Sequence, residues 1–252
     1  MTANVGNDLA AVLRRLRLSP ILGTLAVRLQ QAREKHMNHE DFLLLVCRDE
    51  IERRDGQATH LRSQKAGLDP QMVSGAWDTS AAVQYDRSKL EELQTLRFVE
   101  AHQNVVIVGP VGVGKTFWAH ALGQLACSRG QKVLCETAIK LHRNLRAARL
   151  DQSWSEQMRR LCQADLLIID DFAQQPLDAL DTSDFNEIVS ERLHRRSTIV
   201  TSNRDPAEWL EMMTPQLQAQ AAVDRFVNAA HDLEIDGESY RKRQKPGRSP
   251  AT

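Results

Sequence analysis

The central and C-terminal parts of the chain alternate between short apolar runs and longer segments in which apolar residues recur every three or four positions. The runs are rich in β-branched residues, as buried parallel strands are, and they occupy 104–108, 132–136, 166–169 and 197–201. The segments with helical spacing are 117–127, 137–149, 156–162, 182–194 and 216–229, and a last, shorter strand is predicted at 231–235. This alternation predicts an α/β fold in which helices cover both faces of a parallel sheet.

The N-terminal part has helical spacing but no comparable strand-like run, beginning with the apolar positions from Leu9 to Leu16. A further helix, capped by Asp86 or Ser88, is expected to run to about residue 101. Between these parts, Asp-Pro and Ser-Gly pairs are typical of a linker. We therefore predict a small all-helical N-terminal domain at 1–68, a linker at 69–86, the main domain at 87–240 and a basic tail at 241–252.

Composition and charge restrict the ligands and the cellular compartment that we expect for the protein. The 252 residues are 42% hydrophobic and carry a formal net charge of +0, so any nucleic-acid binding must come from local patches. Through residue 100, 14 Lys and Arg balance 14 Asp and Glu, which leaves a solvated helical surface and a DNA-binding one equally open. The four cysteines are scattered without a C-x-x-C pair, and no signal peptide or membrane span is evident. We expect a cytoplasmic protein with reduced thiols and no membrane contact.

The segment Gly109-Pro-Val-Gly-Val-Gly-Lys115-Thr116 matches the phosphate-binding pattern G-x-x-x-x-G-K-[ST] between a predicted strand and a predicted helix. Backbone N–H groups and the helix N-terminus would face the phosphates of ATP, Lys115 would meet the β- and γ-phosphates, and Thr116 would help to hold Mg²⁺. The alternative is a glycine turn without function. The residues expected to contact nucleotide are Gly109, Pro110, Val111, Gly112, Val113, Gly114, Lys115, Thr116 and Phe117.

Polar residues at the ends of later strands complete the predicted hydrolytic site. Asp170 and Asp171 follow the apolar run 166–169, where the first can hold Mg²⁺ and the second can accept a proton from the attacking water. Asp171 reaches one methylene less far than the commoner Glu. Asn203 follows the next strand and can orient the water or the γ-phosphate, although an Asn there is often only a turn former. Arg225 can stabilise transition-state charge, with a surface pair to Asp224 as its alternative role.

The motifs GPVGVGKT, LLIIDDFAQQP, TIVTSN and AVDRFVNAAHDLEIDGESYR occur in that order. This series resembles the IstB-like ATP-binding helpers of insertion-sequence transposition and, more distantly, the DnaC-like helicase loaders, both in the initiator branch of AAA+ ATPases. Val111 in place of Pro and Phe117 in place of His are mild departures. The resemblance implies an AAA+ fold, a Walker B pair at Asp170 and Asp171, sensor one at Asn203, an arginine finger at Arg225 and a sensor-two-like role for Arg241.

The resemblance also implies partners: an ATP-dependent homo-oligomer with ATP sites shared between subunits, assembled on duplex DNA, that recruits a transposase or, alternatively, a replicative helicase. The predicted helix 137–149 lies where related ATPases carry a DNA-facing insertion. Between 132 and 149 five Lys and Arg face one Glu, 5 − 1 = +4, so Lys140, Arg143 and Arg146 are predicted DNA contacts. The alternatives are a solvated helix face and DNA contacts on the N-terminal arginines instead.

Two further classes of protein share parts of this pattern. A P-loop kinase would need an arginine-rich lid and an acceptor pocket, and the series Asp170-Asp171, Asn203, Arg225 favours hydrolysis instead. A DNA-binding adaptor with a degenerate ATP site is disfavoured by the presence of Lys115, Thr116 and Asp171. The sequence therefore predicts an ATP hydrolase that uses ATP and Mg²⁺.

Overall fold

The computed structural model describes residues 6–79 and 83–240, and the chain divides into two compact units after His60. The first unit is helical, as predicted: it contains α1 Asn7–Arg15, α2 Ile21–Glu34 and most of α3, which spans His39–Ala66 and so ends beyond the division. Its small core consists of Ile21, Leu25 and Val46 with neighbouring leucines. The guanidinium of Arg28 donates to both carboxylate oxygens of Asp49, at 2.7 and 2.9 Å, and so joins α2 to α3.

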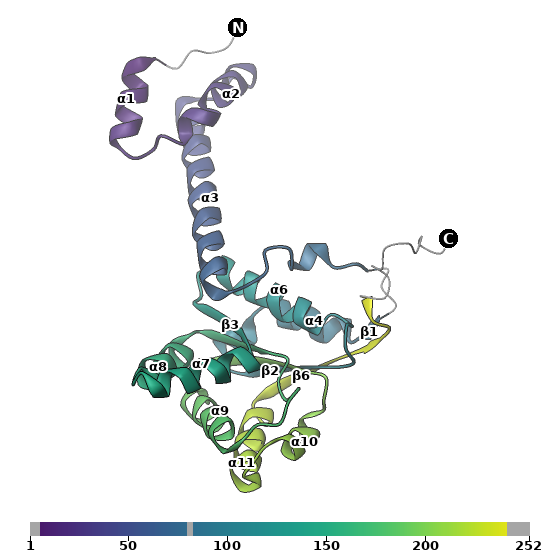
Figure 1. Ribbon diagram of the computed structural model, residues 1–252. Coiled ribbons are helices and arrows are strands. Elements are labelled where there is room, and N and C mark those ends of the chain that lie inside the picture. Colours follow the sequence, from purple (N-terminus) through teal and green to yellow (C-terminus); the bar gives the residue numbers. More distant parts are fainter. Residues whose placement is uncertain (1–5, 80–82, 241–252) are drawn as a thin grey trace, which may run out of the picture. The chain divides into compact units, whose positions relative to one another are not determined.

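A six-stranded sheet forms the centre of the second unit (Figure 1). The strands are β1 Val83–Tyr85, β2 Asn104–Val108, β3 Val133–Thr137, β4 Leu166–Asp170, β5 Ser197–Ser202 and β6 Ala230–Gly237. Their order is β1-β6-β2-β5-β4-β3; β2 to β6 run parallel, and β1 pairs antiparallel with β6. The predicted α/β fold with a parallel sheet is thus confirmed, and β5 separates β2 from β4.

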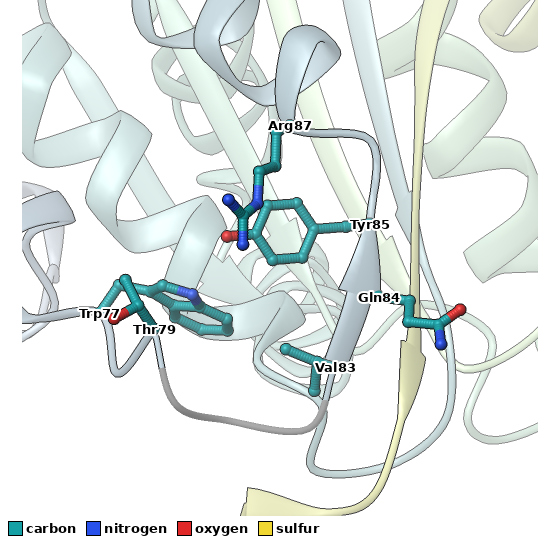
Figure 2. Close-up of a pocket in the computed structure, with 6 residues that line it drawn as sticks. All are labelled: Trp77, Thr79, Val83, Gln84, Tyr85 and Arg87. Atoms are coloured by element: carbon teal, nitrogen blue, oxygen red, sulfur yellow. The ribbon is translucent and has the colours of Figure 1, made fainter.

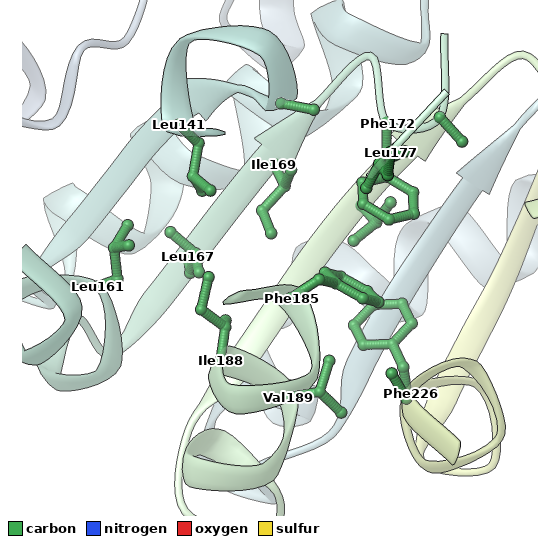
Figure 3. Close-up of a cluster of buried hydrophobic side chains, with 14 of the residues drawn as sticks. Leu141, Leu161, Leu167, Ile169, Phe172, Leu177, Phe185, Ile188, Val189 and Phe226 are labelled. Atoms are coloured by element: carbon green, nitrogen blue, oxygen red, sulfur yellow. The ribbon is translucent and has the colours of Figure 1, made fainter. Parts of the chain in front are cut away.

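Helices cover both faces of the sheet because successive strand residues point to opposite sides. One face packs on α4 Arg87–Gln94, α5 Arg97–Glu100 and α6 Lys115–Ser128. The other packs on α7 Ala138–Leu150, α8 Trp154–Gln163, α9 Ala179–Arg192, α10 Pro206–Trp209 and α11 Gln216–Val227. On β4, Leu166 and Ile168 belong to the hydrophobic core on the first face, whereas Leu167 and Ile169 belong to the core on the second face. Figure 3 shows this second core. Short 3₁₀ turns occur at Ser74–Ala76 and Leu210–Met212.

Three expectations about the segment before β2 need correction. The predicted helix to residue 101 is broken at Leu96, which adopts φ 58° between α4 and α5, although Asp86 does cap α4 by accepting from the Lys89 N–H. The expected linker 69–86 contains β1, which extends the sheet. Residue 68 is not the end of the helical unit, because the chain divides after His60 and Leu68 lies in a sheet core.

The chain contains no helix, within the described residues, that is long and apolar enough to cross a membrane. All four cysteines have free thiols. The predicted basic tail and Arg241 lie outside the described residues.

Candidate functional site

The loop between β2 and α6 has the shape that its glycines predict. Gly109, Gly112 and Gly114 adopt φ values of 147°, 88° and 105°, which disfavour any side chain. A Cβ on Gly109 would lie 1.9 Å from the Ile235 carbonyl oxygen, and a Cβ on Gly114 would lie 2.6 Å from the ring of Trp77. The loop therefore needs glycine both for its backbone angles and for the close approach of its neighbours.

Lys115 and Thr116 open α6 directly after this loop. The ammonium group of Lys115 is buried and donates to the carbonyl oxygens of Gly109 and Pro110, each at 2.7 Å. The lysine therefore curls back over the loop and holds a positive charge within it. The helix N-terminus adds its own positive partial charge at the same place, so an anion such as a triphosphate is the ligand that this loop favours.

Asp170 ends β4 and faces Thr116. The Thr116 hydroxyl lies 3.0 and 3.1 Å from the two carboxylate oxygens of Asp170, although 54 residues separate them in the chain. Hydroxyl and carboxylate oxygens suit Mg²⁺, which keeps several waters and uses substrate phosphates as ligands. No group of three or more His, Cys, Asp or Glu among the described residues could hold a metal ion. Thr116 and Asp170 thus fit an ion that shares its coordination with a nucleotide.

Asp171 turns away from the strand with φ 56°, an uncommon angle for a residue with a side chain. It lines a cavity of about 300 Å³ together with residues of α7, among them His142 and Arg143. His142 is 8% exposed, and its Nδ1 lies 3.5 Å from an Asp181 carboxylate oxygen. Asp171 therefore lies directly after Asp170 at the end of β4 and lines a cavity against α7, where it remains partly accessible.

Sequence reasoning missed an aromatic group beside the loop. Trp77 lies with its ring centroid 5.1 Å from that of Phe117, 5.0 Å from that of Trp118 and 6.0 Å from that of Tyr85. A neighbouring cavity has a volume of about 270 Å³. Trp77, Tyr85 and Arg87 line it, and Figure 2 shows their side chains pointing toward one another. A tryptophan is a large apolar residue that usually packs against others, and this could have indicated a buried site. Its place in a Gly- and Pro-containing segment indicated a linker instead.

Asn203 and Arg225 are positioned differently from each other. Asn203 is exposed directly after β5, the strand between β2 and β4, and so lies at the same edge of the sheet as Asp170. Arg225 is exposed on α11 and donates to Asn186 Oδ1 at 3.2 Å and Ser190 Oγ at 3.1 Å, both on α9. The alternative pairing of Arg225 with Asp224 is therefore wrong.

The basic residues of α7 fall into two groups. Lys140 and Arg143 are exposed and form no ion pair within the described residues. Arg146, by contrast, pairs with Asp178 at 2.7 Å and Asp181 at 2.6 Å. Arg149 similarly pairs with the buried Asp184 of α9. Half of the predicted basic face is thus matched by carboxylates of the same unit.

Comparison with known protein families gives a match to the model of the IstB-like ATP binding protein over residues 11–247. One relative, named as an ATP-binding protein in an insertion sequence of Mycobacterium tuberculosis, is 35% identical over 94% of this chain and 95% of its own length. Another, named as an ATP-binding protein of insertion sequence IS21 from Pseudomonas aeruginosa, is 32% identical over 95% of this chain and 90% of its own.

Among solved structures, the fold is similar to that of the DnaC helicase loader, with a TM-score of 0.51 and 20% identity. That match covers 60% of this chain and 91% of the other. At this identity the likeness concerns the fold alone, and it agrees with the predicted AAA+ architecture of the second unit.

Proposed function

Because the chain belongs to the family of IstB-like ATP-binding proteins, we propose that it hydrolyses ATP as a helper of a transposition system. The observation that carries the proposal is the meeting of Thr116 and Asp170 beside the phosphate loop. Two Mg²⁺-type ligands from distant parts of the chain lie together where the loop and the α6 N-terminus favour a triphosphate.

The position of each side chain supports a role for it in this chemistry. Lys115 would neutralise charge on the β- and γ-phosphates, and Thr116 and Asp170 would hold Mg²⁺, which when bound would draw charge from the phosphate oxygens. Asp171 accepts the proton of the attacking water. Asn203 orients that water through its amide. These roles are proposals that the geometry of the strand ends supports.

The aromatic side chains around Trp77 suit a binding site for the adenine base of ATP. The indole of Trp77 touches the Gly114 end of the loop, and Tyr85 and Arg87 line the adjoining cavity. An aromatic face stacks on a purine, and such stacking contributes about 1–3 kcal/mol per base. Trp77→Ala should therefore weaken binding of ATP more than binding of inorganic triphosphate. Equal weakening of both would contradict a base site here.

The finer part of the proposal concerns DNA and assembly. Exposed Lys140 and Arg143 on α7 supply cations for phosphates of duplex DNA. Arg225, exposed on α11, completes the ATP site of a neighbouring copy, so that hydrolysis depends on a homo-oligomer. The client is a transposase, because the relatives are named as proteins of insertion sequences.

A helicase loader is the second candidate. The fold likeness to the DnaC helicase loader favours it, since the same ATPase unit could serve a replicative helicase. We rank it lower because the family match extends over residues 11–247, whereas the likeness to the loader covers 60% of the chain.

One experiment tests the proposal and separates the clients. The full chain is incubated with a labelled duplex DNA and ATP, ADP or no nucleotide, while DNA binding and phosphate release are measured. A transposase of an insertion sequence of the same family and a replicative helicase are then added separately. We expect ATP to strengthen DNA binding. Of the two added proteins, we expect only the transposase to be retained on the DNA-bound complex. Retention of the helicase alone would favour the loader, and DNA binding without any response to ATP would favour an adaptor.

A further inference from the structure

We propose that Thr201 is a positioning residue for both carboxylates at the end of β4, and that its hydroxyl sets the geometry on which hydrolysis depends. This inference rests on the proposed function. Thr201 is fully buried in β5, the strand between β2 and β4. Its role is separate from those proposed for Asn203 and for the acidic residues themselves.

The hydroxyl of Thr201 has two partners, and their chemistry fixes the direction of each hydrogen bond. The backbone N–H of Asp171 can only donate, and it lies 2.9 Å from Thr201 Oγ1. The single hydroxyl proton is therefore free to point to Asp170 Oδ1, 2.5 Å away. One side chain thus fixes the carboxylate of Asp170 and the backbone of Asp171 at the same time.

Two further hydrogen bonds near Thr201 hold the turn that follows β4. The Phe172 N–H donates to the Thr201 carbonyl oxygen at 2.8 Å, and the Ser202 hydroxyl donates to the Phe172 carbonyl oxygen at 2.9 Å. Between these anchors Asp171 has φ 56°, an angle that is uncommon for residues with a side chain although Asp adopts it more readily than most. The direction of the Asp171 carboxylate follows from this conformation.

Loss of the hydroxyl would act on both acids. Asp170 would keep Thr116 as a partner but could rotate, since Thr201 no longer restrains Oδ1. Asp171 could relax toward a commoner φ and swing its carboxylate away from the water. Displacement of a reacting group by about 1 Å can cost roughly 100-fold in rate. Sequence reasoning missed this residue because a Thr within a strand is typical of β structure in general.

The test compares Thr201→Val, which exchanges the hydroxyl for a methyl group at nearly constant volume, with Thr201→Ser, which keeps the hydroxyl. Thr182→Val is the matched control, because Thr182 is also fully buried and its hydroxyl has no hydrogen-bond partner among residues 6–79 and 83–240. Each variant is assayed for kcat and KM with ATP, and binding of a fluorescent ATP analogue is measured with Mg²⁺ and with EDTA. Unfolding midpoints show which variants are folded.

We expect Thr201→Val to lower kcat roughly tenfold or more, since hydrogen bonds to charged groups are at stake. Its affinity for the analogue in EDTA should match the wild type, while the gain in affinity on adding Mg²⁺ shrinks. Thr201→Ser should stay within roughly threefold of the wild type, and Thr182→Val should equal it.

Thr201→Val with an unchanged kcat and Mg²⁺ response would overturn the proposal, as would equal losses in Thr201→Val and Thr182→Val. If Thr201→Val does not fold, Thr201→Ala takes its place, because it differs from Thr201→Ser by the hydroxyl oxygen alone. Equal activity of those two would also overturn the proposal. Absence of hydrolysis in the wild type would contradict the proposed function instead, so the two failures are distinguishable.

Discussion

Arg146 of α7 makes a bidentate contact with Asp181 of α9: its Nε and Nη2 donate to the two carboxylate oxygens at 3.1 and 2.6 Å. The hydrogen bonds that it donates to Asp181 and, to a lesser extent, to Asp178 raise the pKa of this guanidinium. One of the three cations predicted to contact DNA is therefore already neutralised within its own unit. Lys140 and Arg143 remain as exposed positive charges on the same helix.

The first prediction follows for DNA binding. Arg143→Gln should weaken binding to all duplex sequences alike and lower the slope of log affinity against log salt by about one. Arg146→Gln should change the slope less, because its charge is matched by Asp178 and Asp181. The measurement is fluorescence anisotropy across a salt series. Arg195→Gln, at a 74% exposed arginine after α9, controls for a general loss of charge.

An unchanged slope in Lys140→Gln and Arg143→Gln would place the phosphate contacts elsewhere, most simply on the N-terminal arginines. A larger loss in Arg146→Gln than in Arg143→Gln would mean that Arg146 leaves its carboxylates to meet DNA.

The second prediction separates binding from hydrolysis. Lys115→Ala removes the buried ammonium from the loop and should weaken ATP binding strongly. Asp171→Asn should keep ATP binding but lose hydrolysis, because it removes the proton acceptor and spares the pair of Thr116 and Asp170. Isothermal titration and phosphate release measure the two effects. Equal loss of ATP affinity in both variants would reject this division of roles.

The third prediction concerns the stability of the second unit. Arg192 is 1% exposed and donates to the carbonyl oxygens of Leu161, Ala164 and Ser197 at 2.7, 2.8 and 2.5 Å. Burial lowers the pKa of Arg192 to about 10, which still leaves it charged at neutral pH. This side chain therefore ties the end of α8 to the start of β5.

Arg192→Met would leave several buried carbonyl groups without donors, each at a cost of about 1–3 kcal/mol. We expect a loss of about 3 kcal/mol or more, or a fall of roughly 6–12 °C in the unfolding midpoint measured by calorimetry. Arg195→Ala should change stability by less than about 0.5 kcal/mol, as exposed pairs do. Equal, small effects in both variants would show that water replaces the lost donors.

Much of this fold was predictable because its signals are local. The apolar run before the phosphate loop predicted a strand at 104–108, and β2 has those bounds, since a strand buried on both faces is apolar throughout. The predicted glycine loop likewise has the required backbone angles. The order of strands was not predictable, because it depends on pairing between segments far apart, such as β2 with β5.

The missed residues share a different property: their partners are distant in sequence. Thr201 acts on Asp170 and Asp171 about thirty residues away, and nothing in the strand pattern reveals that contact. For Arg225, the alternative to a role in catalysis was a pair with its neighbour Asp224. Adjacent residues on a helix do not face each other, however, so its actual partners are Asn186 and Ser190 of α9.

The fourth prediction is a dependence of stability on pH. Burial lowers the pKa of His142; Asp181 and Asp184 oppose the shift, Arg146 reinforces it and Asp178 opposes it. Below about pH 6.5 the unfolded chain binds a proton that the folded chain does not, so stability falls as pH falls. His142→Phe should flatten this decline between roughly pH 7.5 and 5.5 in denaturant titrations. His194→Asn, at an exposed site, should keep the wild-type slope, and a parallel curve for His142→Phe would contradict the prediction.

The last prediction concerns assembly and distinguishes a shared ATP site from a self-contained one. Arg225 is exposed on α11, and its hydrogen-bond partners lie on α9 rather than on the phosphate loop of its own chain. An arginine supplied by a neighbour adds on the order of 10³–10⁵ in rate with little effect on nucleotide affinity. Arg225→Ala should therefore bind ATP and hydrolyse it poorly.

Mixing Arg225→Ala with Lys115→Ala should restore part of the activity, because the second variant still offers Arg225 to a neighbour whose phosphate loop is intact. One variant is titrated into the other at fixed total protein with duplex DNA present. The double variant Asn186→Ala, Ser190→Ala removes both partners of Arg225 in its own chain and controls for a role in joining α11 to α9. If that double variant loses hydrolysis as Arg225→Ala does, and mixed oligomers never exceed the summed activity of the two variants, then Arg225 serves its own chain. The ATP site would in that case be complete within one subunit.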